Sequence, residues 1–196
     1  MHVTYKMTSA MTIMILVATG ILLPSVVHAQ TKYQATLGLS AYGITNGGDI
    51  TLDTGGLAEL EGEAILPTNT AIYINAFGTT NDASVAFWTG TTVDTVTLTI
   101  KSYGGFVGLR QYFDTGSAAQ PFIGAGLGGI HRSGDVSADG VTVSIDGDTV
   151  YALQAGIGVD FVLGQFVIGP QARYHYYDYA SADQAWDIGV RIGMRF

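Results

Sequence analysis

The fold is decided by the stretch WDIGVRIGMRF at residues 186–196. Trp, Ile, Val, Ile, Met and Phe occupy its even positions, whereas Asp, Gly, Arg, Gly and Arg occupy its odd positions. Successive side chains of a β-strand point to opposite faces, so this alternation gives one apolar face and one polar or small face. The stretch therefore predicts a transmembrane strand whose apolar face meets lipid and whose other face lines a barrel.

Two preceding segments, 151–161 and 166–176, alternate in the same way, and all three segments begin and end with an aromatic residue ten positions apart. Ten steps of ~3.4 Å, tilted by ~40° from the barrel axis, cover roughly 26 Å, close to the height of the apolar band of such barrels. We therefore expect aromatic girdles where the strands leave the membrane. The predicted girdle residues are Phe113, Tyr151, Phe161, Phe166, Tyr176, Trp186 and Phe196.

Weaker alternation upstream completes a set of eight strands. The five further strands are predicted at residues 33–44, 58–66, 71–78, 98–113 and 121–131. Short connections at 67–70, 114–120 and 162–165 alternate with long polar connections at 45–57, 79–96, 132–149 and 178–185. An even number of antiparallel strands with short and long connections is typical of outer-membrane barrels, with the long loops outside. The sequence predicts an all-β fold, an eight-stranded antiparallel transmembrane up-and-down β-barrel.

The N-terminal segment has the features of a signal peptide. Lys6 precedes an apolar run at 13–23 that is short for a transmembrane helix, and Ala29 supplies a small residue at the cleavage position. We expect cleavage between Ala29 and Gln30, which makes 1–29 the signal peptide and 30–196 a single barrel domain. The seven remaining basic residues against 16 acidic ones give a net charge of −9, which argues against nucleic acid as a partner.

Four stretches carry a resemblance to a known family. They are YGGFVGLRQYF at 103–113, PFIGAGLG at 121–128, GIGVDF at 156–161, and the terminal run from Gly189 to Phe196. They resemble the outer membrane protein β-barrel superfamily, the group that includes the N-terminal domain of outer membrane protein A and the outer membrane protein W type. The resemblance implies a location in the outer membrane of a Gram-negative bacterium, among lipids and lipopolysaccharide. It also implies that the barrel-assembly machinery recognises Phe196.

The alternation places several charges inside the barrel. They are Glu61, Glu63, Arg110, Asp160, Arg173 and Arg191, with Glu59 and Arg195 on the same faces. Charges enclosed by a barrel must be paired or hydrated. We expect a structural ion-pair network in the lumen that joins the two glutamates to the three arginines. A narrow gated pore lined by these groups and a proton or substrate relay are the alternatives.

Catalytic chemistry has weak support in the sequence. An eight-stranded lipid A deacylase carries a His-x-Ser pair, in which a base activates a nucleophile. Here His175 is followed two positions later by Tyr177 and points inward by parity, whereas His131 precedes Ser133 at the outer end of a predicted strand. A histidine at a loop edge is the commoner interpretation, so we expect no catalytic residues and no enzyme activity.

Asp and Gly recur in the long connection at 132–149, which raises the question of calcium. Calcium sites take six to eight oxygen ligands, and the connection has no twelve-residue ligand series with a closing Glu. Turn-forming Asp-Gly pairs in a long hairpin are therefore favoured. Gly124-x-Gly126-x-Gly128 lies in a predicted strand with no helix after it, so it is no nucleotide site. We expect no metal and no cofactor.

These inferences favour a non-enzymatic outer-membrane barrel with a structural or surface-interaction role, in which the outer loops carry any specificity for a host or surface ligand. A narrow channel for small or apolar solutes is the alternative. A lipid A-modifying enzyme is the third hypothesis. The fold alone does not choose among them, because small barrels serve all these functions.

Overall fold

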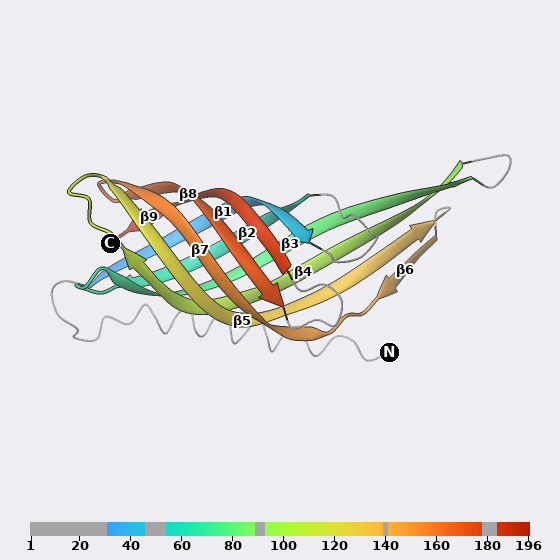
Figure 1. Ribbon diagram of the computed structural model, residues 1–196, viewed down its shortest axis with the longest axis horizontal. Coiled ribbons are helices and arrows are strands. Elements are labelled where there is room, and N and C mark those ends of the chain that lie inside the picture. Colours follow the sequence, from blue (N-terminus) through green and yellow to red (C-terminus); the bar gives the residue numbers. More distant parts are fainter. Residues whose placement is uncertain (1–30, 46–53, 89–92, 139–140, 178–183) are drawn as a thin grey trace. The chain divides into compact units, whose positions relative to one another are not determined.

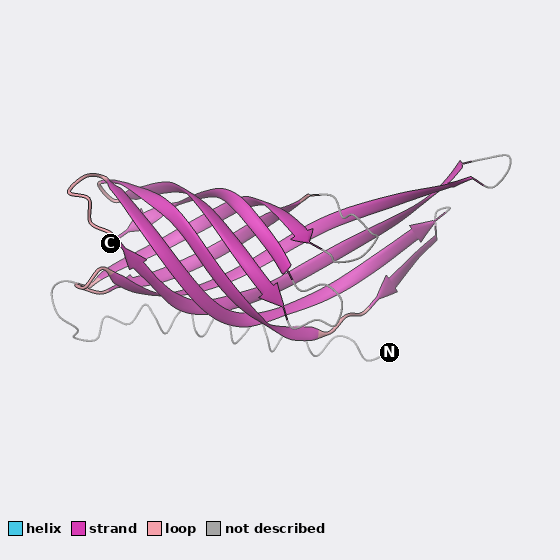
Figure 2. Ribbon diagram, in the orientation of Figure 1, coloured by secondary structure: helices cyan, strands magenta, loops and turns pink. Residues whose placement is uncertain are grey.

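The computed structural model describes residues 31–45, 54–88, 93–138, 141–177 and 184–196. The predicted signal peptide and its cleavage residues Ala29 and Gln30 lie outside these ranges. No helix in the described ranges is long and apolar enough to cross a membrane. Figure 2 shows that the regular structure of these ranges is β-strand.

The described residues form nine strands. These are β1 (Lys32–Thr45), β2 (Gly55–Ile65), β3 (Thr70–Trp88), β4 (Val93–Tyr112), β5 (Ala119–Ala138), β6 (Val141–Ile145), β7 (Thr149–Leu163), β8 (Phe166–Tyr177) and β9 (Gln184–Arg195). All pairs are antiparallel, in the order β4-β3-β2-β1-β9-β8-β7-β5, and β4 also pairs with β5. That last pairing closes a ring of eight strands, so the predicted fold class is confirmed (Figure 1).

The C-terminal strand is fastened to the first strand at its last residue. Phe196 donates its backbone N–H to Tyr33 O at 2.7 Å, and Tyr33 donates back to Phe196 O at 3.1 Å. Tight turns at the same end of the barrel include Gly164, whose φ of 67° favours glycine. The short connections therefore gather at this end, as the sequence predicts.

Two of the connections that the sequence predicts as loops, 79–96 and 132–149, are largely strands. β3 and β4 stay paired as far as Trp88 and Val93, and β5 continues to Ala138, where β6 pairs with it. The reason is local composition, because 93–100 reads VDTVTLTI, an alternation rich in β-branched residues. Figure 1 shows these hairpins continuing past the ends of the other strands. We call residues 81–88, 93–101, 133–138 and 141–145 the projecting sheet.

Burial in the barrel is the inverse of burial in a soluble protein. Leu60 and Leu127 on the outside are each 63% exposed, whereas Glu61 and Arg191 on the inside are 2% and 0% exposed. A broad exposed apolar surface needs a covering, and a closed barrel satisfies its backbone hydrogen bonds internally, so lipid is a suitable covering. All seven predicted girdle residues lie on this outer surface, with exposed fractions from 37% for Trp186 to 84% for Tyr151.

Candidate functional site

The lumen holds the predicted charges, and Arg191 lies at the centre of them. Its Nη1 lies 2.6 Å from Glu61 Oε1, and its Nη2 lies 2.7 Å from both Glu63 Oε1 and Asp160 Oδ2. Its Nε donates to Asp160 Oδ1 at 2.9 Å. One guanidinium, itself fully buried, therefore binds three buried carboxylates that come from β2 and β7.

Arg110 completes this group from β4. It donates to both oxygens of Glu61, at 2.9 and 3.0 Å, and it also pairs with Glu63. Two parallel N–H···O bonds fix the orientation of a guanidinium as well as its position. Arg110 and Arg191 both lie over the ring of Phe122, at 4.4 and 5.0 Å from its centroid. Such cation–π contacts add attraction in a desolvated site.

Three further polar side chains join the same group. Gln34 donates to Glu63 and Asp160 at 3.2 and 3.1 Å, and Arg195 donates to Gln34 at 2.7 Å. Tyr112 donates to Glu63 at 2.8 Å. The full set forms the inner cluster: Gln34, Glu61, Glu63, Arg110, Tyr112, Asp160, Arg191 and Arg195. Gln34 and Tyr112 were not among the predicted network residues, although their position on the inward faces of their strands could have identified them.

Arg173 was expected to join Glu61 and Glu63, but the structure pairs it elsewhere. It binds Glu59 and donates from Nε to Asp187 Oδ2 at 3.0 Å. The reason is strand register, because Arg173 on β8 lies directly opposite Asp187 on β9. His175 Nε2 lies 2.7 Å from the same carboxylate, and Gln171 donates to Glu59 at 2.6 Å. Glu59, Gln171, Arg173, His175 and Asp187 form the middle cluster.

An aromatic cluster surrounds His175. The centroid of the His175 ring lies 5.6 Å from that of Phe106, 6.1 Å from those of Tyr42 and Tyr177, and 6.4 Å from that of Phe77. The hydroxyls of Tyr42 and Tyr177 are hydrogen-bonded to each other. Both tyrosines are fully buried. This cluster was not predicted from the sequence, although the alternation places Phe106 and Tyr177 on the lumen side and so indicates it.

The inner cluster reaches across the whole barrel. Arg191 on β9 donates to the Tyr112 hydroxyl on β4 at 2.9 Å, and these two strands occupy opposite positions in the ring of eight. In the described part of the barrel, five buried carboxylates and four buried guanidiniums each take part in an ion pair. A barrel of eight strands leaves an interior that side chains can fill, and these side chains bond to one another across it.

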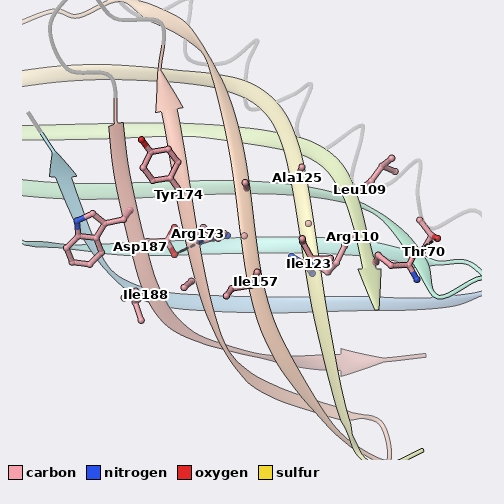
Figure 3. Close-up of a pocket in the computed structure, with 16 residues that line it drawn as sticks. Thr70, Leu109, Arg110, Ile123, Ala125, Ile157, Arg173, Tyr174, Asp187 and Ile188 are labelled. Carbon is pink, nitrogen blue, oxygen red and sulfur yellow. Dashed lines mark hydrogen bonds and ion pairs between the residues drawn. The ribbon is translucent and has the colours of Figure 1, made fainter. Parts of the chain in front are cut away.

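Figure 3 shows a second feature, an open groove that lies across β4, β5, β7, β8 and β9. Leu109, Ile123, Ile157, Tyr174 and Ile188 line it, and all of them are exposed on the outer surface of the barrel. Its floor includes small residues, which are Gly124, Ala125, Ala155, Gly156 and Ala172. Its lining also includes Arg110, Arg173 and Asp187, which belong to the inner and middle clusters.

His131, the candidate catalytic histidine, and Asp135, an aspartate of the 132–149 connection, are both hydrogen-bonded to neighbouring strands. His131 Nδ1 lies 3.2 Å from Thr149 Oγ1, and its ring lies 4.9 Å from that of Tyr103. Asp135 accepts from Lys101 Nζ and from Ser144 Oγ, both at 2.7 Å, and these hydrogen bonds, the one from Lys101 first, hold the pKa of Asp135 below its ordinary value. Among the described residues, no three His, Cys, Asp or Glu side chains are grouped to hold a metal ion.

No protein-family model and no curated protein sequence matches the chain. Solved structures do match. OprG from Pseudomonas aeruginosa aligns with a TM-score of 0.59 at 14% identity, over 86% of this chain and 97% of that one. Neisserial surface protein A aligns with a TM-score of 0.57 at 15% identity, over 85% and 97%. Ail, the attachment invasion locus protein of Yersinia pestis, aligns with a TM-score of 0.52 at 18% identity, over 84% and 98%. The chain therefore has the fold of the small eight-stranded outer-membrane β-barrels, in agreement with the resemblance in its sequence.

Proposed function

We propose that this protein is a non-conducting, non-enzymatic barrel of the outer membrane that holds the projecting sheet at the cell surface. The observation that carries the proposal is the bond between Arg191 and Tyr112, which spans the lumen from one side to the other. A structural or surface-interaction role follows, because a closed barrel leaves the external segments as the part that meets other molecules.

The energetics of the inner cluster support a closed lumen. A solute that passed through would have to separate Arg191 and Arg110 from Glu61 and Glu63, which are all 4% exposed or less. Separation of a buried ion pair leaves an uncompensated charge, at a cost of about 3–5 kcal/mol. The aromatic cluster adds buried rings beside the middle cluster, which narrows the lumen further.

The projecting sheet has the order that a binding surface needs. On one face Ser137 and Thr142 are hydrogen-bonded at 2.9 Å, and Thr99 donates to Asp82 at 2.7 Å. The Lys101–Asp135 ion pair lies on the same face. Side-chain bonds between neighbouring strands hold the sheet in one conformation, so a partner loses less entropy on binding it.

The narrow channel is the second candidate, and solute entry separates it from the proposal. Purified protein is reconstituted into liposomes. The swelling of these liposomes in solutions of small sugars is measured, and so is their uptake of a small apolar solute. We expect both rates to equal those of protein-free liposomes. Entry of either solute well above that background overturns the closed-barrel proposal in favour of the channel.

The proposal that the protein is no enzyme has its own test. Lipid A is incubated with the reconstituted protein, and its acyl chains are counted by mass spectrometry. We expect unchanged lipid A. If the wild type releases an acyl chain and His131→Ala no longer does so, the protein is a deacylase instead.

A further inference from the structure

The short strand β6 leaves one edge of the projecting sheet open. β6 pairs with β5 in the register Gly134↔Ile145 to Ala138↔Val141, and the strand order of the described residues ends at β6. The outer edge of such a strand presents backbone N–H and C=O groups that can pair with another strand. Among the described residues β3 has a second unpaired edge beyond Thr80, but Asp82 places a charge on it, so the β6 edge is better suited to add a strand.

The side chains of β6 do nothing to block such pairing. Val141, Val143 and Ile145 are 65%, 58% and 54% exposed on one face, and Thr142 and Ser144 alternate with them on the other. Proteins usually protect an exposed edge with charged residues, Pro or a bulge. The strand has the sequence VTVSI, which contains neither a charged residue nor Pro, and the β5–β6 register is continuous.

The same five residues are complementary to themselves. When two copies of β6 pair antiparallel about Val143, Val143 faces Val143 of the second copy, Val141 faces Ile145, and Thr142 faces Ser144. Apolar side chains then lie opposite apolar ones, and hydroxyls opposite hydroxyls, which is the arrangement that stabilises cross-strand pairs. A shift by one residue would place apolar side chains opposite hydroxyls, so the sequence selects this register.

The direction of β6 decides which copies can meet. β6 belongs to a hairpin that continues away from the barrel (Figure 1). Two barrels in one membrane point the same way, so strands that run away from that membrane cannot become antiparallel. Two barrels in facing membranes point toward each other, and their β6 strands then run in opposite directions. The antiparallel register therefore fits copies in facing membranes.

We propose that β6 pairs with β6 of a second copy of this chain, head to head, and so joins barrels held in two facing membranes. The inference rests on the proposed surface role and names its partner. A pair of five-residue strands is smaller than the ~1,200 Å² of a standard stable interface, so each contact is weak. Many copies in each membrane act together and supply the strength.

The absence of cysteine from the sequence allows a sharp test. Val143→Cys places a thiol on the two-fold axis, so reconstituted protein should form disulfide-linked dimers under mild oxidation. Val141→Cys alone and Ile145→Cys alone should not, because each thiol then faces an apolar side chain. When liposomes that carry Val141→Cys are mixed with liposomes that carry Ile145→Cys, the two proteins should become cross-linked between vesicles.

A charge on the edge provides the second arm. Wild-type proteoliposomes should cluster, and Val143→Lys should abolish that clustering. Thr95→Lys, exposed on β4 of the projecting sheet, is the matched control and should leave clustering unchanged. Val107→Lys is unsuitable as a control, because Val107 lies on the outer face of β4 within the barrel, where it meets lipid. Equal cross-linking at all three cysteine positions, or none at Val143→Cys in folded protein, overturns the inference. Either result leaves the closed-barrel proposal standing, because that proposal is tested by solute entry.

Discussion

Arg191 and Tyr112 bond across the full width of the barrel, since their strands β9 and β4 occupy opposite positions in the ring. The same guanidinium also binds Glu61, Glu63 and Asp160. One side chain therefore links three parts of the barrel wall. This arrangement supports the proposal that the lumen is a structural core built from charges, and it leads to predictions on stability and on conductance.

Loss of the central guanidinium should destabilise the barrel strongly. Arg191→Leu leaves three buried carboxylates without their shared partner, and removal of one member of a buried pair costs about 3–5 kcal/mol. The free energy of unfolding is measured by urea titration in lipid vesicles. Lys101→Met, which breaks an exposed ion pair, is the control and should change little. Equal effects of the two variants would contradict the central role of Arg191.

Gly43 should be required for the position of Trp186. The two residues are paired across β1 and β9, and a Cβ at Gly43 would lie 2.5 Å from the Trp186 ring. In a Trp88→Phe background, which leaves one tryptophan, Gly43→Val should move the indole and shift its fluorescence toward the red. Ala41→Val lies two positions away on the same outer face and should leave the spectrum unchanged. An unchanged spectrum in Gly43→Val would show that the indole does not rest on Gly43.

The β5–β6 hairpin should loosen in acid. Hydrogen bonds from Lys101 and then Ser144 lower the pKa of Asp135, so its stabilising contribution is present at neutral pH and is lost as the pH falls through that lowered pKa. The carboxyl titration is followed by NMR, together with hydrogen exchange of the β6 amides. Lys101→Ala should move the titration of Asp135 to higher pH. If the titration does not move, the ion pair does not set the pKa.

Much of the barrel could be predicted because alternation is a local property. The inward faces that hold Glu61, Arg110 and Arg191 follow from parity once the strands are placed. Parity does not state which inward residues meet, because contacts across a lumen depend on the stagger of all eight strands. Arg173 illustrates this limit, since it pairs with Asp187, its neighbour in the strand register, and not with the expected Glu61 and Glu63.

The projecting sheet was missed for a different reason. Thr, Ser, Asp and Gly are common in 79–96 and 132–149, and this composition favours a loop when the whole segment is averaged. The local alternation of β-branched residues at 93–100 and in β6 favours strands instead, because each can continue a ladder that the barrel has already begun. Pairing with an existing strand therefore prevailed over average composition.

Single-channel current across a planar bilayer tests the closed lumen most directly. We predict no steady openings for the wild-type barrel, and a measurable ion leak for the double variant Arg191→Ala/Tyr112→Ala, which removes the bond across the lumen. Steady openings of the wild type that disappear in Arg110→Leu or Glu61→Gln would contradict the closed lumen, because the charges would then line a pore.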